Sequence, residues 1–180
     1  MKKTLGKLIL KLLGWTMDYD IPKVKKYVLV VAPHTSAWDM IIGKLYNWAL
    51  EFNSSIIVKK EFFYFPVGII LRKWGAVGID RQNPKNIVQQ IVDEFGRRKE
   101  MILTITPEGT RRANPNWKTG FYRIATTAKV PIYLIYGDFK RKHVGWLGEF
   151  IPTGDMDKDI EAIKQKYKNI TAYRPEWFAI

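Results

Sequence analysis

Residues 27–33, YVLVVAP, are followed directly by residues 34–40, HTSAWDM. The first stretch is β-branched and carries apolar residues at both alternating positions, which is typical of a strand buried on both faces of a sheet. His34 and Asp39 come at the point where this apolar run stops. Open α/β sheets bind ligands beyond the carboxyl ends of their strands. The stretch therefore predicts a central strand that leads into a candidate site.

The rest of the chain repeats this alternation of short apolar runs with helical patterns. Further strands are expected at residues 55–60, 75–80, 101–106 and 131–136. Helices are expected over the apolar stripe from Trp38 to Phe52, over residues 83–98 with Asn83 as N-cap and Pro84 at the first helical position, and over residues 121–129 and 157–169. This order predicts an α/β fold, with one mixed sheet flanked by helices in a single domain over residues 1–180.

The N-terminal residues 1–15 form a separate amphipathic pattern. Leu5, Leu8, Ile9, Leu12 and Leu13 recur at helical spacing, and lysines lie largely off that stripe. Lysines also interrupt what would be the core of a signal peptide, so we expect the segment to be retained, and it is too short to span a bilayer. Two interpretations stay open: a helix lying on a membrane surface, or a helix packed on the domain.

Composition favours an anionic partner. The 180 residues include 30 Lys and Arg against 17 Asp and Glu, a net charge of +13, together with seven Trp. Such a charge suits nucleic acid, a phosphate-bearing metabolite or an anionic bilayer. The chain has no cysteine and only two histidines, so a disulfide framework, a thiolate nucleophile and a metal site are not expected.

His34 and Asp39 have two possible roles. An imidazole beside a carboxylate can act as a general base. Alternatively, Ser36 can cap the helix that follows, with Asp39 three residues on as the partner in a capping box. Asp39 lies off the apolar stripe of its helix, where it could turn toward the imidazole. The spacing alone favours the capping role.

Two further stretches place arginines at strand ends. TPEGTRR, residues 106–112, follows the strand at 101–106, and we expect Glu108 to hold an arginine in place. GAVGIDR, residues 75–81, ends in Arg81. Arginine binds phosphate through two parallel hydrogen bonds, so these strand ends suit a phosphorylated ligand. The alternative is a solvated surface cluster of charge.

Together these stretches resemble the lysophosphatidic acid acyltransferase family, the glycerolipid acyltransferases of the PlsC type. Its four blocks occur in order, and the likeness extends over about residues 27–137. The blocks are HTSAWD at residues 34–39, GAVGIDR at residues 75–81, PEGTR at residues 107–111 and VPI at residues 130–132. Gly78, Thr106 and Arg112 differ from the residues usual in the family, which leaves the acceptor open.

The resemblance implies a function and a set of site residues. His34, oriented by Asp39, would take the proton from an acceptor hydroxyl that attacks an acyl thioester. Arg81 and Arg111 would bind the acceptor's phosphate, or a carboxylate in an amino-acid lipid. Glu108, Gly109 and Thr110 would complete this substrate-binding pocket, with Gly109 allowing a close backbone approach. An aromatic cluster, which sequence alone would place in the core, could instead line a slot for the acyl chain; it comprises Phe62, Phe63, Tyr64, Phe65 and Trp74.

The expected activity is O-acyl transfer to a lysolipid, with 1-acylglycerol-3-phosphate as acceptor and phosphatidic acid as product. The donor would be acyl carrier protein or coenzyme A thioester, with no cofactor and no metal. The expected location is the cytoplasmic face of the cell membrane, as a peripheral protein on an anionic surface, without a nucleic-acid partner. The alternatives are another acceptor such as an amino-acid lysolipid, a thioesterase, or a non-enzymatic module that binds anionic lipid or nucleic acid.

Overall fold

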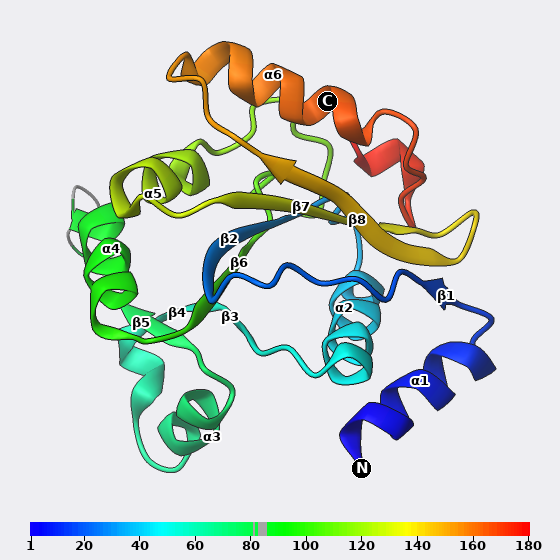
Figure 1. Ribbon diagram of the computed structural model, residues 1–180, viewed down its shortest axis with the longest axis horizontal. Coiled ribbons are helices and arrows are strands. Elements are labelled where there is room, and N and C mark those ends of the chain that lie inside the picture. Colours follow the sequence, from blue (N-terminus) through cyan, green and yellow to red (C-terminus); the bar gives the residue numbers. More distant parts are fainter. Residues whose placement is uncertain (81, 83–85) are drawn as a thin grey trace.

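A computed structural model describes residues 1–180 except 81 and 83–85. Asn83 and Pro84, expected at the start of a helix, and Arg81 of the second block lie outside the described residues. The main sheet has the strand order β1-β8-β7-β2-β6-β3 (Figure 1). Its strands are β1 (Thr16–Met17), β2 (Lys26–Val31), β3 (Ser54–Ser55), β6 (Met101–Ile105), β7 (Ile132–Asp138) and β8 (His143–Phe150).

Strand β2 lies at the centre of this sheet. It pairs in parallel with β6 on one side and with β7 on the other, and residues 27–30 are all buried. Parallel neighbours need crossover connections, which helices provide; β7 and β8 form the antiparallel pair. The predicted central strand and the mixed sheet are confirmed. The helices are α1 (Lys2–Leu12), α2 (Ala37–Leu50), α3 (Val67–Lys73), α4 (Ile87–Arg97), α5 (Gly120–Ala128) and α6 (Met156–Tyr167).

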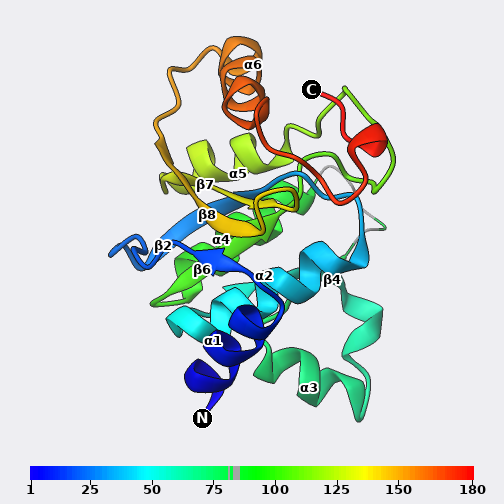
Figure 2. The same ribbon diagram turned by 90° about the vertical axis from the view of Figure 1, so that its right-hand side faces the viewer.

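The helices form two layers, one on each side of the sheet. Val28 and Val30 point into a core shared with α4, α5 and α6, whereas Tyr27 and Leu29 point into a core shared with α1 and α2. Figure 2 shows α5 and α6 on one side of the sheet and α1 and α2 on the other. The alternation follows from the two-residue period of a strand. Both faces of β2 are therefore covered, as its continuous apolar run predicts.

Two predicted strands belong to a second, smaller sheet. The run at 55–60 is broken at Ile56: β3 pairs with β6, but β4 (Ile57–Lys59) pairs with β5 (Val77–Ile79). The crossover between β4 and β5 consists of a 3₁₀ turn, η1 (Lys60–Phe63), and α3. An apolar run specifies a strand without specifying its neighbour, so sequence alone could not separate the two sheets.

Strand β8 was not predicted, because two glycines, Gly145 and Gly148, interrupt its apolar pattern. Its pairing with β7 in a hairpin forms it nonetheless. His143 is half-buried on this strand, with its Nε2 3.2 Å from Asp18 Oδ1. This His–Asp pair joins the segment after β1 to β8.

Helix α1 is packed on α2 by one side only. Gly6 and Leu10 are buried, but Leu8 and Leu12 of the predicted stripe are 52% and 76% exposed. Lys3 Nζ lies 2.6 Å from Glu51 Oε2, just after the end of α2. The stripe predicted from the sequence is therefore largely free of the domain. None of the helices in the described part of the chain combines the length and apolarity needed to cross a bilayer.

Other apolar side chains in and beside α2, η1 and α3 are also exposed. Figure 2 shows that α1, α2 and α3 lie on the same side of the main sheet. Trp38 and Ile41, expected on the buried stripe of α2, are 44% and 41% exposed. Most of the aromatic cluster is exposed as well, so its assignment to the core was wrong. We call the following set the apolar face: Leu5, Leu8, Leu12, Trp38, Ile41, Phe62, Tyr64, Phe65, Ile69, Ile70 and Trp74.

Gly6→Ala is expected to lower the free energy of unfolding by about 1–3 kcal/mol. A Cβ at Gly6 would lie 2.7 Å from Leu45 O and 2.9 Å from Ala49 N, so α1 and α2 would have to separate. Gly43→Ala on α2 is the matched control, because its Cβ would meet nothing within 4 Å; alanine should there stabilise the helix by about 0.5–1 kcal/mol. Urea unfolding measures the free energy of unfolding of both variants. Equal stabilisation by both substitutions would contradict the close packing of α1 on α2 at Gly6.

Candidate active site

The loop after β2 is organised by the carboxylate of Asp39. Its Oδ2 accepts hydrogen bonds from the backbone N–H groups of Thr35 and Ser36, each at 2.7 Å. Ser36 Oγ in turn accepts from Trp38 N at 3.0 Å. These bonds form the predicted capping box at the start of α2. They satisfy backbone donors that the first turn of a helix otherwise leaves without partners.

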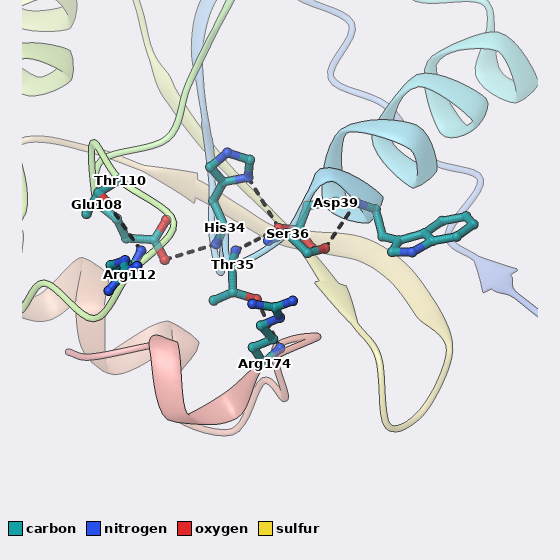
Figure 3. Close-up of polar contacts among 9 residues, drawn as sticks. His34, Thr35, Ser36, Asp39, Glu108, Thr110, Arg112 and Arg174 are labelled. Carbon is teal, nitrogen blue, oxygen red and sulfur yellow. Dashed lines mark hydrogen bonds and ion pairs between the residues drawn. The ribbon is translucent and has the colours of Figure 1, made fainter.

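The same carboxylate also faces the imidazole. Asp39 Oδ2 lies 3.3 Å from His34 Nδ1, and the two side chains are 7% and 19% exposed, respectively (Figure 3). Because Nδ1 is directed at Asp39, Nε2 is the ring nitrogen left to face a substrate. The two roles considered for the pair are thus compatible, since one oxygen serves both the helix start and the histidine.

Glu108 holds His34 from the other side. It follows β6, the parallel neighbour of β2, so the two strand ends meet. Glu108 Oε1 accepts from His34 N at 3.0 Å, and the residue is only 3% exposed. The expected pair between Glu108 and an arginine is not present within the described residues. The buried carboxyl group of Glu108 accepts its hydrogen bond from the nearby backbone N–H of His34, and in this way Glu108 fixes the position of the histidine.

Burial also changes the ionisation of Glu108. It raises the pKa of this carboxyl group to about 7; the hydrogen bond from His34 N opposes the rise, and the charge of Asp39 adds to it. Its second oxygen, Oε2, is buried and has no hydrogen-bond partner in the described part of the structure. A carboxyl group in this setting is partly protonated near neutral pH.

The PEGTR loop is shaped by its own polar contacts. Gly109 has a φ of +67°, a conformation that glycine adopts without strain. Thr110 Oγ1 accepts from Arg112 N at 3.2 Å, and Asn114 Nδ2 donates to Glu108 O at 2.8 Å. Arg111 is exposed. Thr110 thus supports its own loop, and no hydrogen bond or ion pair among the described residues joins Arg111 to the histidine.

The structure therefore brings His34, Asp39 and Glu108 together, whereas the predicted role of Arg111 is not supported by a contact with them among the described residues. Sequence reasoning missed two contacts: the Thr35 side chain, which accepts from Arg174 N at 3.1 Å, and the Asn114 bond that supports the loop. No local pattern marks either one, because Arg174 lies 139 positions from Thr35. Over the described ranges, no three His, Asp or Glu side chains are grouped as metal ligands would be.

Comparison with known protein families shows which family this chain matches. The sequence profile of the family described as Acyltransferase matches residues 17–136, which is more than half of the chain and includes His34, Asp39 and Glu108. This chain belongs to the acyltransferase family. The resemblance stated from the four blocks is thereby confirmed for the family, and the mixed α/β fold agrees with it.

Two similar proteins are informative about this acyltransferase. A 1-acyl-sn-glycerol-3-phosphate acyltransferase of Streptococcus pneumoniae is 31% identical over 113 residues, which are 62% of this chain and 42% of the relative. The match thus spans less than half the relative's length. The crystal structure of the lysophosphatidic acid acyltransferase PlsC of Thermotoga maritima has a TM-score of 0.62 at 16% identity, covering 95% of this chain and 80% of that one. That likeness shows a shared fold.

Glu108→Gln should make the stability of this acyltransferase less dependent on pH. The pKa of Glu108 rises from 4.5 to about 7 on folding, so the folded chain binds the proton more tightly than the unfolded chain does. The wild-type free energy of unfolding should therefore fall as pH rises through this window, by up to about 3 kcal/mol. Glutamine keeps an oxygen for His34 N–H and does not ionise.

Urea unfolding at about pH 5 and about pH 8 measures this difference. Glu61→Gln, at an exposed glutamate of η1, is the matched control and should retain the wild-type pH dependence. If Glu108→Gln also retained the wild-type dependence, Glu108 would not be the group that titrates.

Proposed function

We propose that this acyltransferase moves a fatty acyl group from an acyl thioester to the hydroxyl of a lysolipid, with 1-acylglycerol-3-phosphate as acceptor and phosphatidic acid as product. The observation that carries the proposal is the histidine held at a strand end by two carboxylates, with Nε2 left for a substrate. The name of the Streptococcus relative supports this choice of acceptor.

In the proposed reaction His34 Nε2 takes the proton of the acceptor hydroxyl as its oxygen attacks the thioester carbonyl. Asp39 stabilises the positive charge that forms on the ring. The tetrahedral intermediate then collapses, the carbon–sulfur bond breaks, and the departing thiolate receives the proton from the imidazolium. Each bond made or broken belongs to the acceptor or the donor, so no acyl-enzyme forms. Either acyl carrier protein or coenzyme A can carry the thioester, and this chemistry needs no metal or cofactor.

The remaining site residues are assigned by their positions. We propose that Arg111, exposed on the loop after β6, binds the acceptor's phosphate together with Arg81. Gly109 lets the loop turn beside Glu108, and Thr110 holds the loop through Arg112 N. Glu108 acts as a positioning residue, because it contacts the backbone of His34 and is too buried to face solvent.

The apolar face supports a peripheral location on an anionic membrane, which we place at the cytoplasmic side. Trp38 and Ile41 lie in the first turns of α2, beside Asp39, so the apolar face reaches the site. Lys44 Nζ lies 5.8 Å from the ring centroid of Trp74, which joins α2 to the α3 region. With a net charge of +13, such a face would be attracted to anionic lipid and would bring an embedded acceptor to His34.

His34→Ala should lower acyl transfer by about 10²–10⁴-fold, because a positioned general base contributes roughly that factor. His143→Ala is the matched control: it removes the other histidine of a His–Asp pair, at the β1–β8 contact, and should retain activity. The assay follows thiol release from acyl-coenzyme A on anionic vesicles, with and without 1-acylglycerol-3-phosphate. Circular dichroism establishes that both variants are folded.

The same assay separates the alternative functions. Release that requires the acceptor and disappears in His34→Ala supports transfer. Release by the wild type at an equal rate without acceptor would identify a thioesterase, in which His34 activates water. Replacement of 1-acylglycerol-3-phosphate by an amino-acid lysolipid tests the other acceptor class, and activity with that lipid alone would overturn the proposed product.

The double variant Leu8→Ser/Leu12→Ser should weaken binding to vesicles that contain phosphatidylglycerol by about tenfold or more, because each leucine loses apolar area that a bilayer would cover. Ile151→Ser is the matched control, since Ile151 is as exposed as Leu12, at 76%, but lies outside the apolar face. Cosedimentation measures binding, and vesicles of phosphatidylcholine alone should bind the wild type more weakly. Equal binding by both variants would contradict the role of α1.

A further inference from the structure

The C-terminal residues 171–179 lie across the carboxyl edge of the main sheet. They include a 3₁₀ turn, η3 (Pro175–Trp177), and are fixed mainly through backbone atoms. Each of the three partners follows the carboxyl end of a different strand, namely β7, β2 and β6. The three hydrogen bonds run from Phe139 N to Thr171 O at 2.9 Å, from Arg174 N to Thr35 Oγ1 at 3.1 Å, and from Trp117 Nε1 to Ala179 O at 3.2 Å.

The middle bond attaches this segment to the catalytic loop. Thr35 is 1% exposed, and its own N–H donates to Asp39 Oδ2. Its hydroxyl accepts a hydrogen bond from the backbone N–H of Arg174, so Arg174 is bonded to the residue that directly follows His34 (Figure 3). The Arg174 side chain takes no part in this bond and remains exposed.

The guanidinium groups of two arginines each lie near the same aromatic ring, that of Trp177. The guanidinium carbon of Arg174 lies 4.1 Å from the centroid of the Trp177 ring, and that of Arg112 lies 5.7 Å from it. Arg112 belongs to the loop that carries Glu108, so the ring joins the C-terminal segment to the PEGTR loop. No carboxylate of the described residues is within ion-pairing distance of either arginine. Two like charges beside one ring, with no carboxylate paired to either, raise the local positive potential and favour an anion nearby.

We propose that Arg112, Arg174 and Trp177 form an anion site that binds the phosphate of the lipid acceptor, in addition to the arginines of the family's own blocks. This inference rests on the proposed function, and it names residues that position and select the acceptor. The cation–π contacts with the indole restrict the guanidinium groups before binding, which lowers the entropy lost when they bind a phosphate. The bond to Thr35 keeps the site in register with His34.

Binding of decyl phosphate, measured by titration calorimetry without any donor, tests the site independently of turnover. Arg174→Ala and Arg112→Ala should each raise the dissociation constant by about ten- to a hundredfold, the effect of a lost hydrogen bond to a charged group. Arg174→Lys should give an intermediate value, because lysine keeps the charge but cannot bind with two parallel bonds. Binding of neutral decyl maltoside should not change.

Arg97→Ala is the matched control. Arg97 is exposed at the end of α4, just before β6 begins, and so lies at the opposite edge of the sheet. The Arg97→Ala variant should bind decyl phosphate as tightly as the wild type does. Arg174→Ala keeps the backbone N–H that bonds to Thr35, so the segment should stay in place, and thermal unfolding establishes that the variant is folded. Unchanged decyl phosphate binding in folded Arg174→Ala and Arg112→Ala would overturn the proposal.

Kinetics identify which substrate supplies the phosphate. The Arg174→Ala variant should show a raised KM for 1-acylglycerol-3-phosphate with acyl-coenzyme A and also with an acyl-N-acetylcysteamine thioester, which contains no phosphate. A rise seen only with acyl-coenzyme A would assign the site to the donor and overturn the proposal. If the wild type bound decyl phosphate through these arginines but transferred no acyl group to the lysolipid, the anion site would be supported and the proposed function would be overturned.

Discussion

Strand β2 is bonded to a parallel strand on each side and covered by helices on both faces, and this constraint decides where polar chemistry can occur. A strand in such a position has no free edge and no solvated face, so its side chains must be apolar and functional groups must follow its end. Because β6 and β7 run in the same direction, their carboxyl ends meet that of β2. His34, Glu108 and the contacts of the C-terminal segment all lie at this edge.

At that edge two carboxylates hold one histidine in different ways. Asp39 is bonded to backbone N–H groups at the start of α2, and these bonds keep its oxygen 3.3 Å from the imidazole. Glu108 contacts the backbone of His34 and is deeply buried. Its raised pKa reduces the repulsion between the two acids, since a partly protonated Glu108 carries less negative charge beside Asp39. Helix capping and histidine orientation thus depend on the same few bonds.

The side chains around the site divide by chemistry. Exposed apolar groups come from α1, α2 and α3, which lie on one side of the main sheet. Trp38 and Ile41 of this face are neighbours of Asp39 at the start of α2. Cationic groups come from the loop after β6 and from the C-terminal segment, where Arg112 and Arg174 share the ring of Trp177. The proposed lipid acceptor, with an apolar chain and an anionic headgroup, matches this division, because each part would find its own kind of surface within reach of His34.

The sequence by itself determined the features that depend on residues near one another in the chain: the buried run of β2, the capping box of Ser36 and Asp39, and the ordered blocks that identify the family. Only the tertiary structure decided that Glu108 contacts the backbone of His34, 74 positions away, that Arg174 binds Thr35, and that β5 joins a second sheet. It also decided that Trp38 and Ile41 are exposed to solvent, although the helical pattern predicts that they are buried. The physical reason is that periodicity and capping report interactions within a few residues, whereas strand order and crossover connections choose the distant partners.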